Sequence, residues 1–161
     1  MRAAMMCGAV ASTTAEAQSR LTEVGVDVFG LSWHYESRTY SDGAETVRYQ
    51  QINPGVGLHV RLGDQGRHVW MLKAGGYDDS MGNPSLYAGL VWQYRLVNGL
   101  HAGGGILLFR SKSYRTPVIP LPLVTYRAGP VGLNMTWVPP GNEFASGALA
   151  FFGTAVIWRR R

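Results

Sequence analysis

Three residues of this sequence carry side chains that could together catalyse acyl transfer: His34, Asp79 and Ser80. A histidine can take a proton from a hydroxyl near neutral pH, and a carboxylate can hold the imidazole in the useful tautomer. A serine hydroxyl can attack an acyl centre or polarise it. The same residue types also fit a packing histidine and an ordinary loop. The hypothesis therefore requires elements that bring the three side chains together.

Strands are the elements that could position this trio. From Val24 onward, alternating apolar and small or polar residues form eight segments, separated by turn signals such as Asn98-Gly99. We expect strands over Val24–Ser37, Tyr49–Leu62, His68–Tyr77, Ser85–Arg95, Leu100–Phe109, Leu121–Ala128, Val131–Val138 and Ala145–Trp158. Their lengths are near the roughly 9–11 residues that a tilted membrane strand needs.

Composition indicates whether these strands face water or lipid. The 161 residues suggest one domain, with only 16% charged residues and 21 glycines. Soluble domains usually carry about 25% charged residues, and no stretch here reaches the roughly 18 apolar residues of a membrane helix. We therefore predict an all-β fold, an eight-stranded antiparallel up-and-down transmembrane β-barrel in the bacterial outer membrane. A soluble lipocalin-like barrel is the alternative.

The first 17 residues have the pattern of an export signal. Arg2 precedes the short apolar run Ala3–Ser12, and Ala15-Glu16-Ala17 fits a cleavage site. We expect a signal peptide over residues 1–17 and a single barrel domain over residues 18–161; the alternative is a frayed N-terminal segment. Cys7 is the only cysteine and lies in this segment, so a mature chain would have no thiol chemistry.

Alternation also predicts which side chains face lipid. In the first strand we expect a lipid-facing set of bulky side chains, Phe29, Leu31, Trp33 and Tyr35, and a lumen-facing set, Gly30, Ser32 and His34. In the fourth strand the lipid-facing set is Leu86, Ala88, Leu90, Trp92 and Tyr94, and the lumen-facing set is Tyr87, Gly89, Val91 and Gln93. The longer connections follow the odd-numbered strands and belong outside the cell. His34, Asp79 and Ser80 should therefore share the outer rim.

Several motifs resemble the lipid A palmitoyltransferase family. Ser32-Trp33-His34, Tyr49–Pro54 and Gly55–Leu58 resemble its first hairpin, and Asp79-Ser80 with Ala88-Gly89 and Trp92 resembles its third-to-fourth strand region. Its sixth and seventh strands are matched by Ile119–Pro122, Gly129–Val131 and Met135–Pro139. The resemblance covers the range from Ser32 to Gly141 in patches, and the proline-bearing motifs are its most specific part.

The resemblance implies that a fatty acyl chain moves from a phospholipid to lipid A, with neither cofactor nor metal, in a monomeric enzyme. The family's catalytic residues match His34, Asp79 and Ser80. A glycine at the floor of the family's acyl pocket is replaced by Val91, close to Gly89, which implies a preference for shorter chains because less methylene surface can be buried. The alternative is that Val91 only fills the barrel core.

Two further groups of residues suit a lipid substrate. Missing strand hydrogen bonds at Pro54, Pro122 and Pro139 could open a lateral route for lipid, although prolines also simply start strands. The cations of an outer loop suit lipid A phosphates, although they also fit a solvated loop: Arg110, Lys112 and Arg115. The net charge of +5 favours an anionic partner, but no nucleotide- or nucleic-acid-binding motif is present.

Two other function classes remain open from the sequence. The same trio would serve a lipid A or phospholipid acyl hydrolase, in which water is the acceptor. A non-catalytic structural or lipid-binding barrel would keep the scaffold without the chemistry.

Overall fold

The computed structural model describes residues 21–35, 38–39, 46–47, 49–112, 118–139 and 147–160. The strands are β1 (Glu23–His34), β2 (Arg38–Thr39), β3 (Thr46–Val47), β4 (Ile52–Gln65), β5 (His68–Asp78), β6 (Pro84–Arg95), β7 (Leu100–Arg110), β8 (Val118–Ala128), β9 (Val131–Val138) and β10 (Ala148–Arg159). None of these described residues belongs to a helix long and apolar enough to cross a membrane. The expected signal peptide lies outside the described residues.

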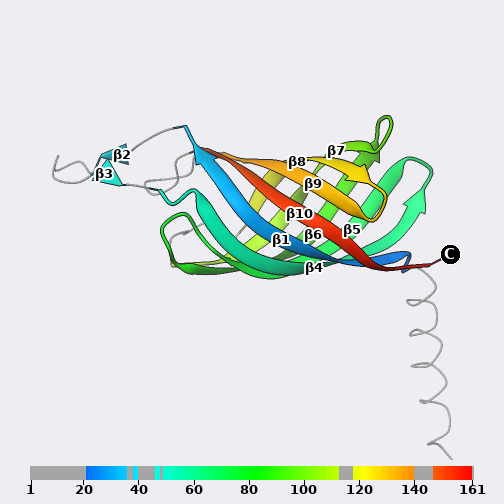
Figure 1. Cartoon of the computed structure of the whole chain (residues 1–161), viewed down its shortest axis with the longest axis horizontal. Helices are drawn as coiled ribbons and strands as arrows, with labels where there is room; N and C mark the ends of the chain where they lie inside the picture. The colour runs from blue at the N-terminus through cyan, green and yellow to red at the C-terminus, as the bar shows by residue number, and fades with distance from the viewer. Residues whose placement is uncertain are drawn as a thin grey trace, which may run out of the picture.

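Eight of these strands close into an antiparallel barrel in the order β1-β10-β9-β8-β7-β6-β5-β4. Each pairs with its neighbours in sequence, and β1 closes the cylinder by pairing with both β4 and β10. The short strands β2 and β3 were not predicted; they pair only with each other and extend beyond one end of the barrel, while the C-terminus lies at the other end (Figure 1). The predicted up-and-down topology is confirmed.

The outer face of the barrel wall is apolar, and its inner face carries both polar and apolar side chains. The two faces differ because successive side chains of a strand point to opposite sides. In β6, Leu86, Leu90 and the residues in phase with them face outward, while Tyr87 and Val91 are buried. Many other outward side chains are large and apolar, among them Leu31, Val56, Ile106, Leu133 and Ile157. A closed wall with this exterior satisfies its backbone hydrogen bonds and presents hydrocarbon to a bilayer, as a transmembrane barrel requires.

One expected orientation was wrong, that of Phe29. Between Phe29 and Leu31 the register shifts against both neighbouring strands, so that Phe29 pairs with Phe152 and Leu31 with Phe151. Relative to β10 the extra residue is Gly30, and a β-bulge of this kind changes the phase of the alternation along β1. Phe29 therefore points into the lumen and stacks on Phe152 with ring centroids 4.9 Å apart, whereas Leu31 faces outward as predicted.

A layer of buried ionic side chains crosses the lumen near the end that carries the short turns. Asp27 is 0% exposed, and its carboxylate accepts hydrogen bonds from Lys73 Nζ and His59 Nδ1, each at 2.9 Å. Apolar side chains fill the next level of the lumen, including Tyr87, Val91, Leu107 and Phe152. The lumen is thus divided into an ionic level and an apolar level, and the apolar level reaches toward the end where β1 terminates.

Candidate functional site

The structure brings His34 and Ser80 together at the end of the barrel opposite the short turns. His34 is the last residue of β1, and Ser80 lies in the turn after β5. The imidazole Nε2 is 2.7 Å from Ser80 Oγ. The backbone supports this approach, because Gln50 N–H donates to the Ser80 carbonyl and so ties the turn to the segment before β4. With the ring proton on Nδ1, Nε2 accepts a hydrogen bond from the Ser80 hydroxyl. This is the arrangement of a general base and its nucleophile.

Two neighbours orient the imidazole. Its ring stacks on Tyr49, with the centroids 4.4 Å apart and the planes 10° from parallel. Ser32 Oγ lies 3.2 Å from the same Nε2. Stacking restricts the ring plane, so Nε2 is directed at the two hydroxyls rather than free to rotate.

Asp79 is locked into the turn that carries Ser80. The residue is 0% exposed, and its Oδ1 accepts the backbone N–H groups of Met81 and Asn83 at 3.0 and 2.9 Å. Its Oδ2 accepts the hydroxyls of Ser85 and Ser111 at 3.0 and 2.7 Å. The carboxylate thereby holds its own loop in shape and joins it to the residue after β7. These bonds position Ser80 through the backbone.

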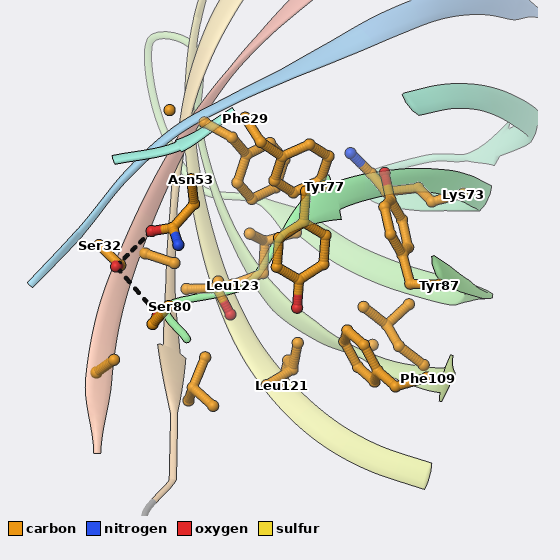
Figure 2. Close-up of a pocket in the computed structure, with 18 of the residues that line it drawn as sticks. Phe29, Ser32, Asn53, Lys73, Tyr77, Ser80, Tyr87, Phe109, Leu121 and Leu123 are labelled. Atoms are coloured by element: carbon orange, nitrogen blue, oxygen red, sulfur yellow. Dashed lines mark hydrogen bonds between the residues drawn. The ribbon is translucent and has the colours of Figure 1, made fainter. Parts of the chain in front are cut away.

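Sequence reasoning missed two polar residues of the site, Ser32 as a participant and Asn53 altogether. Ser32 Oγ donates to Asn53 Oδ1 at 2.5 Å and lies 3.5 Å from Ser80 Oγ (Figure 2). The amide nitrogen of Asn53 donates to the Asp78 carbonyl at 3.1 Å, immediately before the Asp79 turn. The signal in the sequence was a polar residue directly before Pro54, in the stretch Ile52–Leu58, whose other residues are apolar or glycine.

An apolar cavity of about 110 Å³ lies directly beneath the hydroxyls of Ser32 and Ser80. Aromatic and aliphatic side chains form its wall, including Phe29, Tyr77, Tyr87, Phe109, Leu121 and Leu123 (Figure 2). At the inner end Lys73 reaches the cavity with its ammonium 5.0 Å from the centroid of the Phe152 ring. The cavity therefore has one polar end, beside Ser32 and Ser80, and walls that are mainly hydrocarbon.

Val91 lies on the wall of this cavity and is 2% exposed. Its side chain covers Gly105, the residue opposite it on β7, where an added Cβ would meet Val91 Cγ2 at 2.8 Å. Gly89 points toward the same side of β6, but it is not among the lining residues. Leu107 occupies the space over Gly89, since a Cβ there would be 2.6 Å from Leu107 Cδ2.

The prolines mark places where strand pairing is interrupted. Pro54 lies between Ile52, which pairs with Leu31, and Gly55, which pairs with Phe29; pairing with β5 starts only at Gly55. Pro54 therefore has no partner residue in the register of either neighbouring strand.

A second interruption separates β8 from β9. Their paired residues end at Leu123 and Thr136, and Pro122 is the next residue along β8. The Pro122 carbonyl instead accepts the Thr136 hydroxyl at 2.7 Å. Beyond this point Leu121 and Val138 line the cavity, and Pro139 directly follows β9. The cavity thus lies behind a stretch of wall in which β8 and β9 are no longer paired.

The predicted cations occupy the same rim in part. Arg110 and Lys112 are exposed, and Ser111 between them donates to Asp79, which places both cations beside the Ser80 turn. Arg115 lies outside the described residues. Within the part of the chain that is described, no group of histidine, cysteine or carboxylate side chains could hold a metal ion.

Comparison with known proteins identifies no family for this chain. No protein-family model matches the chain, and no curated protein matches its sequence. Among solved structures, the chain is similar to that of the Yersinia pestis outer membrane protein Ail in a phospholipid bilayer nanodisc. The match has 10% sequence identity and a TM-score of 0.41, and it covers 84% of this chain and 99% of Ail. The function of this chain must therefore be inferred from its own residues.

Proposed function

We propose that this chain is an outer-membrane acyltransferase that moves a fatty acyl chain from a phospholipid to lipid A. The observation that carries the proposal is the 2.7 Å contact between His34 Nε2 and Ser80 Oγ at the mouth of an apolar cavity, inside a barrel whose outer surface suits lipid. A base beside a hydroxyl supplies the chemistry of ester cleavage. The apolar cavity walls offer a nonpolar environment to an acyl chain.

In the covalent route, His34 takes the hydroxyl proton as Ser80 Oγ attacks the donor ester carbonyl. The ester C–O bond breaks, and the leaving glycerol oxygen takes the proton from His34 as the lysophospholipid departs. His34 then deprotonates a lipid A hydroxyl, whose oxygen attacks the acyl-serine carbonyl. The bond from the acyl carbon to Ser80 Oγ breaks, and Ser80 Oγ takes the proton back from His34. In the direct route, His34 activates the lipid A hydroxyl and Ser80 polarises the carbonyl. Trapping of an acyl-serine distinguishes the two routes.

Three other residues support this chemistry in the proposal. Ser32 Oγ, 3.5 Å from Ser80 Oγ and 3.2 Å from His34 Nε2, acts as a positioning residue for the reacting hydroxyl and its base. Asn53 holds Ser32 in place through the bond to Oδ1. Asp79 acts as a positioning residue through the turn that it closes.

The interrupted pairing between β8 and β9 supports lateral entry of lipid. An acyl chain that enters from the bilayer needs a stretch of wall without a continuous hydrogen-bonded ladder, and proline removes one donor from such a ladder. Leu121 and Val138, on either side of the unpaired stretch, line the cavity. Arg110 and Lys112 at the same rim suit the phosphates of lipid A.

The decisive experiment uses the purified barrel in liposomes that contain lipid A and a phospholipid with a labelled acyl chain. Labelled lipid A is the expected product. Release of free fatty acid alone would replace the proposal with an acyl hydrolase. No turnover by a barrel shown to be folded by its heat-dependent gel mobility would leave a non-catalytic lipid-binding barrel.

Substitution of Val91 by glycine is expected to shift the donor preference toward longer chains. Val91 borders the cavity and covers Gly105, so its removal opens space between β6 and β7. Each additional buried methylene is worth about 0.8 kcal/mol, or a factor of about four in relative rate. The measurement is competition between labelled donors of different chain length, with the outward-facing Leu90→Ala as the matched control. An unchanged preference would show that Val91 only fills the core.

A further inference from the structure

A second recess lies at the opposite end of the barrel, on the far side of the buried Asp27–Lys73 pair. Its volume is about 470 Å³, and its wall comes from the start of β1, the end of β10 and the short-turn ends of other strands. The lining residues are Thr22, Glu23, Arg61, Arg95, His101, Arg127, Arg159 and Arg160. Neither the proposed acyl chemistry nor the lipid route uses any of them.

Positive charge is concentrated in this recess. Five of its lining residues are arginines and one is a carboxylate, which leaves four positive charges among them. Arginines remain charged under all ordinary conditions, so this excess cannot be removed by deprotonation.

The carboxylate holds several of these arginines in a fixed arrangement. Glu23 is 1% exposed. Its two carboxylate oxygens accept hydrogen bonds from the two terminal nitrogens of Arg127, at 2.9 and 3.0 Å. The Oε2 oxygen of Glu23 also accepts hydrogen bonds from Nε and a terminal nitrogen of Arg159, at 2.9 and 2.8 Å. Arg61, itself buried, has a terminal nitrogen 3.8 Å from the same oxygen. Three guanidinium groups thus converge on one carboxylate before any ligand arrives.

We propose that this recess binds a phosphate group, carried either by inorganic phosphate or by a phospholipid headgroup. Guanidinium groups match the tetrahedral oxygens of phosphate with pairs of parallel hydrogen bonds. Like charges crowded into a partly desolvated recess repel one another, and a bound anion would offset that repulsion. Arg95 and Arg160 line the same recess as the Glu23 cluster, so a phosphate bound there would add acceptor oxygens among these guanidinium groups.

The test is the thermal stability of the refolded full chain in zwitterionic detergent micelles. Inorganic phosphate is titrated against chloride at matched ionic strength, and short-chain phosphatidic acid below its micelle concentration forms the second arm. We expect a saturable rise in the unfolding temperature that chloride does not produce. A response to phosphatidic acid but not to inorganic phosphate would identify the headgroup as the source of the phosphate.

A matched pair of variants locates the binding. Arg95→Gln with Arg160→Gln removes two lining cations while leaving the Glu23 contacts of Arg127 and Arg159 in place, and is expected to weaken the response at least tenfold. Arg67→Gln removes an exposed cation outside the recess and should not change it. An equal response in the double variant and in Arg67→Gln, or none in the unmodified chain, would overturn the proposal.

Discussion

Replacement of His34 by alanine is expected to lower acyl transfer by a factor of about 10²–10⁴, the contribution typical of one positioned general base. In the unmodified chain Nε2 lies 2.7 Å from the Ser80 hydroxyl, so the base stands within reach of the proton that it must take. Removal of the imidazole leaves the cavity walls and the Ser80 turn, and therefore donor binding, largely intact. The loss should appear in kcat rather than in KM.

The measurement is the initial rate of lipid A acylation in liposomes, at equal amounts of folded barrel. His68→Ala is the matched control: His68 begins β5 at the opposite end, where its ring stacks on Trp92, so its removal should leave the rate unchanged. Ser80→Ala should produce a loss comparable to that of His34→Ala, and the double variant little more, because the two side chains act as one unit. A His34→Ala barrel that retained more than about a tenth of the rate would exclude the histidine as the base.

Lys73→Met alone is expected to destabilise the barrel by about 3–5 kcal/mol, the usual cost of breaking a buried ion pair from one side. Lys73 Nζ donates to Asp27 Oδ2 at 2.9 Å, and Asp27 is completely buried. The single substitution strands a carboxylate inside the barrel with His59 as its one remaining described partner. The double variant Asp27→Asn/Lys73→Met removes both charges and should recover most of the lost stability.

Urea unfolding in phospholipid vesicles, followed by tryptophan fluorescence, gives the free energies for this comparison. Lys112→Met serves as the control, because Lys112 is exposed at the outer rim and its replacement should change the free energy of unfolding by less than about 0.5 kcal/mol. A Lys73→Met variant as stable as the unmodified chain, or a double variant no more stable than the single one, would contradict a structural role for the pair.

The same pair shapes the proposed site. The Lys73 ammonium borders the inner end of the cavity, so the ionic level forms a polar limit to the depth that an acyl chain reaches. Val91 narrows the cavity from the side of β6. In the proposed acyltransferase we expect chain-length preference to depend on both side chains, and the Val91→Gly experiment isolates one of the two contributions.

The sequence by itself determined the strands, their antiparallel order and most of the faces. The direction of a side chain on a strand depends only on the parity of its position, so the alternation from Leu86 to Gln93 was sufficient to separate lipid-facing from buried residues. Loop lengths then placed His34 and Ser80 at one rim, where the structure has them. The acyl-transfer chemistry assigned to them stays a prediction.

Tertiary structure alone decided the features that depend on register between distant strands. The bulge at Gly30 reversed the expected orientation of Phe29, and this extra residue becomes visible only when β1 is aligned with β10. The bond from Ser32 to Asn53 and the ion pair of Asp27 with Lys73 likewise join residues brought opposite one another by barrel closure. Parity is a local property that the sequence carries, whereas contacts across a closed sheet depend on the register of all its strands.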